Sequence, residues 1–229
     1  MAESTSDPLT WVSLGNRDIE AGGLSLVGDA WSRVIPADVD NRVGPELMAQ
    51  MPSDGWRELS LLDSHGPNAS HLFAAPNEDG WALVHLTGRG DGLILSGDPG
   101  PYLVRPGRPR RRQGLALTWP EGIRCQASDL GSLSVTLQNT SATTWVWDPE
   151  DHGYVHGWLL DDRGDRLAPG YFAYTPRQHP LRDLAPGESM SLGVDFGPAA
   201  DRVRPGRYDV EAVLTALDLW STKATLVVT

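Results

Sequence analysis

Alternation of apolar and polar residues in the second half of the chain constrains the fold more than any other feature. It occurs in four separate segments, at residues 133–138, 190–196, 208–214 and 223–228. Successive side chains of an extended strand point to opposite faces, so alternation buries one face and leaves the other in solvent. An amphipathic helix would instead place apolar residues three and four positions apart. The segments therefore predict antiparallel strands.

Turn-forming residues separate these segments at short intervals. Asn139-Thr140-Ser141 follows one segment, Pro186-Gly187 and Pro205-Gly206 each precede another, and a further turn signal spans residues 161–165. Proline presets φ, glycine accepts left-handed backbone, and Asn and Asp side chains bond to nearby backbone in turns. The second half therefore predicts seven or eight short strands and no long helix, which is typical of a β-sandwich.

Two runs in this region, Leu184-Ala185-Pro186-Gly187-Glu188-Ser189 and Pro205-Gly206-Arg207-Tyr208-Asp209-Val210, resemble bacterial immunoglobulin-like domains. Fibronectin-III-like modules and intracellular proteinase-inhibitor-like domains are the nearest kinds. In such folds a Pro-Gly-x-Tyr run enters a late strand, so the resemblance implies that Tyr208 braces a corner. The resemblance covers the C-terminal half only. It implies a fold and no particular activity, because this architecture supports many functions.

The first half of the chain carries weaker signals. Residues 81–87 and 92–96 predict a hairpin, residues 58–62 and 71–74 predict two more strands, and residues 45–51 predict a short helix closed by Pro52. The sequence thus predicts a mainly β protein in three parts. These are a smaller β-rich or α+β domain at residues 1–104, an Arg/Pro-rich connector at 105–113, and an immunoglobulin-like β-sandwich at 114–229.

Charge and composition restrict the surroundings of the chain. Its 229 residues carry a formal net charge of −11, which disfavours nucleic acid and anionic membrane surfaces as partners. No run approaches the about 18 apolar residues of a membrane span. The first residues lack the basic and apolar regions of a signal peptide, and Cys125 is the single cysteine. We therefore expect a cytoplasmic protein.

Patterns that would indicate catalysis are missing from the sequence, which lacks zinc-protease, nucleophile-elbow, phosphate-loop and dinucleotide motifs. His152 and His156 are four apart, but Gly153 favours turn and strand, where that spacing spans about 13 Å and is too long for one metal. We interpret Cys125 as a packing residue and residues 161–165 as a charged turn rather than a calcium site. The sequence therefore predicts no catalytic residue, no metal and no cofactor.

Two features suggest contacts with a partner. The chain has nine tryptophans, and Trp145 and Trp147 are two apart, so on a strand they would share a face. They either fill the core, which we favour, or lie exposed and contact a protein or a glycan. Residues 105–112 carry five arginines, among them Arg110, Arg111 and Arg112. We interpret this segment as a solvated linker or as a strap on the protein's own acidic surface, in preference to a site that binds an acidic protein or nucleic acid.

Three classes of function stay open on this basis. The first is a non-enzymatic protein-binding or assembly module, whose partner the sequence does not identify. The second is a glycan-binding or glycan-enzyme accessory domain that uses exposed tryptophans. The third is a structural protein that self-associates through edge strands. Exposure of Trp145 and Trp147 distinguishes the second class from the first.

Overall fold

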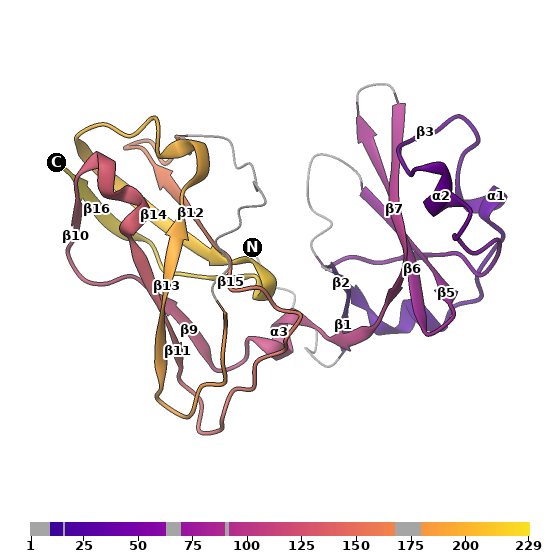
Figure 1. Ribbon diagram of the computed structural model, residues 1–229, viewed down its shortest axis with the longest axis horizontal. Helices are drawn as coiled ribbons and strands as arrows, with labels where there is room; N and C mark the ends of the chain where they lie inside the picture. Colours follow the sequence, from indigo (N-terminus) through magenta and orange to yellow (C-terminus); the bar gives the residue numbers. More distant parts are fainter. Residues whose placement is uncertain (1–9, 16, 63–69, 90–91, 168–179) are drawn as a thin grey trace. The chain divides into compact units, whose positions relative to one another are not determined.

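The computed structural model describes residues 10–15, 17–62, 70–89, 92–167 and 180–229. The chain is mainly β, as the sequence predicts. It divides into two compact units, unit 1 at residues 1–111 and unit 2 at residues 112–229 (Figure 1). Among the residues described, unit 2 contains one cluster of buried apolar residues and unit 1 contains two, so each unit has a core of its own.

Unit 1 is built from short strands and single helical turns. Its strands are β1 (Trp11–Leu14), β2 (Arg17–Glu20), β3 (Asp40–Asn41), β4 (Arg57–Leu59), β5 (Ser70–Asn77), β6 (Gly80–Arg89), β7 (Gly92–Tyr102) and β8 (Val104–Pro106). Its helical turns are η2 (Ala21–Ser25), α1 (Trp31–Val34), α2 (Pro45–Met48) and α3 (Arg108–Arg111). The strands form a five-stranded sheet in the order β3-β7-β6-β5-β4 and a three-stranded sheet in the order β2-β1-β8.

The elements predicted for the first half are present. β6 and β7 form the antiparallel hairpin, and β4 and β5 are the two further strands. The helix α2 ends at Met48, before the predicted residue 51, because the amides of Gln50 and Met51 bond three residues back and tighten the last turn.

The five-stranded sheet of unit 1 is buried on both faces. Along β6, Ala82, Val84 and Leu86 join one apolar cluster. Leu83 joins the other cluster, together with Leu14 of the three-stranded sheet. A strand buried on both faces carries apolar residues at successive positions, so it lacks the alternation that identifies strands in the second half.

Over its described residues, unit 2 has eight strands, where the sequence predicts seven or eight. They are β9 (Leu115–Thr118), β10 (Ile123–Cys125), β11 (Ser134–Asn139), β12 (Val155–Leu160), β13 (Ser189–Asp195), β14 (Gly206–Leu214), β15 (Leu219–Trp220) and β16 (Ala224–Val228). Short 3₁₀ turns lie between some of them, namely η3 (Ala127–Ser132), η4 (Gly197–Ala199) and η5 (Thr215–Leu217). Their order is β10-β16-β14-β12-β13-β11-β9, with β15 also paired to β14.

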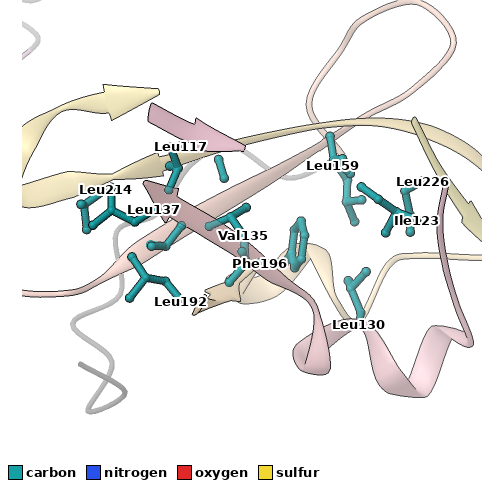
Figure 2. Packing of buried hydrophobic residues seen from close by; sticks show 14 of the residues in the cluster. Leu117, Ile123, Leu130, Val135, Leu137, Leu159, Leu192, Phe196, Leu214 and Leu226 are labelled. Atoms are coloured by element: carbon teal, nitrogen blue, oxygen red, sulfur yellow. The ribbon is translucent and has the colours of Figure 1, made fainter. Parts of the chain in front are cut away.

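This sheet curls because β13 pairs in two directions. Residues 189–193 pair antiparallel with β11, whereas Val194 and Asp195 pair parallel with β12. Every strand except β15 contributes to the single buried cluster, part of which Figure 2 shows. Two layers therefore face each other across this core. One consists of β9, β11 and the first part of β13, and the other of β12, β14 and β16 with β10 parallel to β16.

Tyr208 holds the backbone at the entry to β14. Its hydroxyl donates to the carbonyl of Arg204 at 3.0 Å and accepts from the amide of the same residue at 3.2 Å. The ring is half-buried and packs against the core. These two bonds tie the residues before β14 to the strand itself.

The arginine-rich segment has a regular structure over residues 104–111. β8 pairs antiparallel with β1, and α3 follows directly. The Nε of Arg108 donates to Oδ2 of buried Asp18 at 2.7 Å, and its amide donates to Oδ1 at 3.0 Å. The interpretation as a solvated linker is therefore wrong for these residues. Pro106 does not prevent pairing, because β8 is an edge strand and Pro106 is its last residue.

Candidate functional site

Trp145 and Trp147 do not form an exposed pair. Trp145 is buried in the core of unit 2, and its backbone exchanges two hydrogen bonds with Leu184, at 2.9 and 3.0 Å. Trp147 is half-buried against the same core, and its Nε1 donates to the carbonyl of Asp151 at 3.1 Å. Both side chains therefore pack against one core, although neither residue lies in a regular strand.

A different pair of tryptophans is stacked on the outer face of unit 2. Along β12, Val155 and Leu159 join the core, so His156 and Trp158 point to the opposite face. The ring of Trp158 stacks on that of Trp220 in β15, with centroids 4.9 Å apart and planes inclined by 11°. Trp158 is buried, whereas Trp220 is 45% exposed. The stack therefore has a covered inner ring and an accessible outer ring.

The two rings come from strands on either side of β14. Trp158 lies opposite Glu211 of β14, and Trp220 lies opposite Val213 of the same strand. Val213 is buried although it is not a member of the core cluster. The two indoles lean towards each other across β14, which explains how this outward-facing valine is covered.

A guanidinium and an imidazole complete the surroundings of Trp158. The Cζ of Arg166 lies 4.6 Å from the centroid of the Trp158 ring, a cation–π contact. Arg166 reaches this position through a tight hairpin, in which Oδ1 of Asp161 accepts the amides of Arg163 and Asp165, both at 2.9 Å. The predicted charged turn at residues 161–165 is confirmed.

His156 lies edge-on to Trp158, with ring centroids 4.5 Å apart and planes inclined by 84°. Its Nδ1 is 3.3 Å from the hydroxyl of Tyr154. Burial lowers the pKa of His156 below its usual 6.5, and the Arg166 guanidinium adds to this, while the Asp195 carboxylate opposes it. The lowered pKa of His156 favours the uncharged imidazole, which packs edge-on against the Trp158 ring.

The three candidate arginines have different surroundings. Arg110 is exposed. Arg111 donates through Nε to the carbonyl of Pro106 at 2.9 Å and through Nη2 to Oγ of Ser13 at 3.2 Å. Arg112 belongs to unit 2, where its Nη1 contacts Oδ2 of Asp218 at 3.1 Å. Asp218 also accepts the indole Nε1 of Trp220 at 2.8 Å, so this arginine belongs to the surroundings of the tryptophan stack.

Cys125 shows no sign of activation as a nucleophile. Burial, followed by the Asp129 carboxylate, raises the pKa of its thiol, which disfavours the reactive thiolate. Within the described ranges, no group of three His, Cys, Asp or Glu residues is placed to hold a metal ion. None of the helices in the same ranges is long and apolar enough to cross a membrane.

Sequence reasoning missed the Trp158–Trp220 stack because its members are far apart in the chain. One signal was available, since the segment from Tyr154 to Leu160 is apolar or aromatic at nearly every position. Such a strand is covered on both faces, which points to a second layer of side chains outside the sandwich core.

Comparison of the chain with protein-family models, with curated protein sequences and with solved structures found no match.

Proposed function

We propose that this chain is a non-enzymatic protein-binding or assembly module and that its contact surface is centred on Trp220. The exposure of this indole, stacked on the buried ring of Trp158, is the observation that carries the proposal. Tryptophan and arginine are the residues most enriched where binding energy concentrates in protein interfaces. Here Trp158, Trp220 and Arg166 lie together.

Preorganisation adds to this argument. The Trp220 ring is held by the stack on one face and by its hydrogen bond to Asp218 at the indole nitrogen. A side chain that is already ordered loses little conformational entropy when a partner covers it, so more of the contact energy is available for affinity.

We further propose that unit 2 is an immunoglobulin-like domain. In that fold strands A, B and E pack against C, F and G. Numbered along the chain, β9, β11 and β13 occupy one layer here, and β12, β14 and β16 the other. The hydroxyl of Tyr208 bonds four residues upstream, as the corner tyrosine of such domains does. A cytoplasmic setting is also part of the proposal, because the chain's single cysteine excludes an internal disulfide.

Capture from native lysate with the wild-type chain, Trp220→Ala and Val146→Ala tests the contact surface. Val146 is an exposed apolar residue on another segment of unit 2, so it is a matched control for the loss of apolar surface. We expect quantitative mass spectrometry to find a protein retained by the wild type and Val146→Ala and lost with Trp220→Ala. A set of captured proteins that does not depend on Trp220 would refute the proposal.

A glycan is the second candidate ligand, favoured by one observation. The near-parallel stack covers one face of the Trp220 indole, while nearly half of the residue is exposed. A flat accessible indole can stack on a sugar ring. Binding to a glycan array that disappears in Trp220→Ala would select this alternative over a protein partner.

A further inference from the structure

Trp220 is connected to Arg112 through a single carboxylate. Oδ1 of Asp218 accepts the indole Nε1 of Trp220 at 2.8 Å, and its Oδ2 lies 3.1 Å from Nη1 of Arg112. Both oxygens of this carboxylate are thus engaged, one by the exposed ring of the contact surface and the other by a guanidinium. Arg112 and Asp218 are each about one-third exposed, so water competes only in part for this pair.

Arg112 also holds the backbone of the turn that carries Asp218. Its Nη1 donates to the carbonyl of Leu217 at 3.2 Å and contacts the carbonyl of Asp218 itself. These carbonyls lie at the end of the 3₁₀ turn η5, where backbone acceptors have no partner within the turn. The Arg112 guanidinium therefore fixes the turn and orients the Asp218 side chain.

The backbone of Asp218 makes this connection depend on the side chain at residue 218. The residue adopts left-handed backbone, with φ at 47°. Among residues with a Cβ, Asp and Asn tolerate this region best. The left-handed backbone at Asp218 allows the chain to enter β15 at the next residue, with the carboxylate beside the indole.

Without the contact between Asp218 and Arg112, fewer interactions fix the orientation of the Trp220 ring. β15 has two residues, and its ladder to β14 fixes the Trp220 backbone but not the side-chain torsions. A hydrogen bond to an ionised acceptor is shorter and stronger than a neutral one and constrains the direction of the indole. We propose that Arg112 is a positioning residue, which acts through Asp218 to hold Trp220 in its stack on Trp158. The positioning of Trp220 by Arg112 does not depend on the proposed function, whereas the importance of this positioning for recognition rests on that function.

Circular dichroism reads this geometry without any partner. Two stacked indoles couple their electronic transitions and give a paired positive and negative band in the far ultraviolet, the exciton couplet. Trp31 and Trp56, which pack edge to face, add a constant signal from unit 1. The spectrum of Trp220→Phe, subtracted from each other spectrum, therefore isolates the couplet of the Trp158–Trp220 pair.

The test compares Arg112→Gln and Asp218→Gly with the control Arg182→Gln. Arg182 is another ion-paired arginine of unit 2, and its Nη1 lies 2.5 Å from a carboxylate oxygen of Glu188. Its contacts with Glu188 and with the Asp183 carbonyl involve neither Trp158 nor Trp220. Glycine suits left-handed backbone, so Asp218→Gly removes the carboxylate without straining the turn. We expect the couplet to fall by more than half in both test variants and to persist in the control.

A wild-type couplet in folded Arg112→Gln would overturn the inference. Should that variant not fold, a wild-type couplet in Asp218→Gly would overturn it equally. The proposed function fails separately, because capture that does not depend on Trp220 leaves the couplet result intact. Loss of the couplet in Arg112→Gln with unchanged capture would retain the positioning role and refute only its importance for recognition.

Discussion

Replacing Asp18 by alanine should destabilise unit 1 by about 3–5 kcal/mol, the usual cost of removing one partner from a buried ion pair. The side chain of Asp18 is 1% exposed and that of Arg108 14%. The carboxylate accepts three hydrogen bonds, from Oγ of Ser13 at 2.6 Å and from the amide and Nε of Arg108 at 3.0 and 2.7 Å. Alanine would remove the one carboxylate that accepts all three of these hydrogen bonds, at a position that is shielded from water.

Urea unfolding of the full chain measures this cost. The two units have separate cores, so their transitions need not coincide, and the unit 1 transition alone should move. At a denaturant slope of about 1–3 kcal/mol per molar, the midpoint should fall by roughly 2 M. The matched control is Asp40→Ala, which removes an exposed pair with Arg42 in the same unit, with side chains 62% and 56% exposed. That control should cost no more than about 1 kcal/mol.

Limited digestion with trypsin gives a second measurement of the same contact. Backbone bonds to Gly107 and the Asp18 pair hold α3, so native protein should resist early cleavage after Arg110 and Arg111. Asp18→Ala should become sensitive there before the rest of unit 1 is degraded. Equal stability of Asp18→Ala and Asp40→Ala, with the same digestion pattern, would refute the claim that this pair anchors the segment.

Two further predictions concern single side chains. Tyr208→Phe should lower the stability of unit 2 by about 1 kcal/mol, because it removes the hydroxyl that bonds Arg204; a change within error in urea unfolding would contradict the corner role. Burial, followed by the Arg17 guanidinium, lowers the pKa of His85 from 6.5 to about 4. Unfolded His85 therefore binds a proton that the folded form does not, so stability should be lost as pH falls from 6.5 towards 4. Over that window the melting temperature of unit 1 should decline less steeply in His85→Gln than in the wild type, and equal slopes would count against a depressed pKa.

The strands of unit 2 were predictable because their signal is local. β11, β13 and β16 bury every second side chain, as does β14 up to Ala212, and that period is visible in a few consecutive residues. The hydroxyl bond of Tyr208 is local as well, since it reaches a residue only four positions away, but the corner role itself was an implication of the resemblance. Unit 1 was harder to predict, because β6 is buried on both faces and loses its period.

The candidate site depended on contacts that local patterns do not encode. Trp145 and Trp147 attracted attention by their spacing, but Trp145 lies in the core. The accessible ring is Trp220, which reaches Trp158 only because β14 lies between their strands. The order of strands in a sheet follows from the packing of the whole unit. The residues next to Trp158 and Trp220 in the sequence therefore do not predict that the two rings stack.

The sequence by itself determined a mainly β chain, the strands of the second half and the turns between them. These depend on backbone preferences and on side-chain period, which act within a few residues. Only the tertiary structure decided the role of the arginine segment, because Asp18 lies 90 residues before its partner Arg108. The sequence does not show which acidic residue pairs with a run of arginines, because that pairing forms only when the chain folds. The exposure of the arginine segment therefore could not be inferred from composition. The contacts of the Asp218 carboxylate, which joins Arg112 to Trp220, could not be inferred from it either.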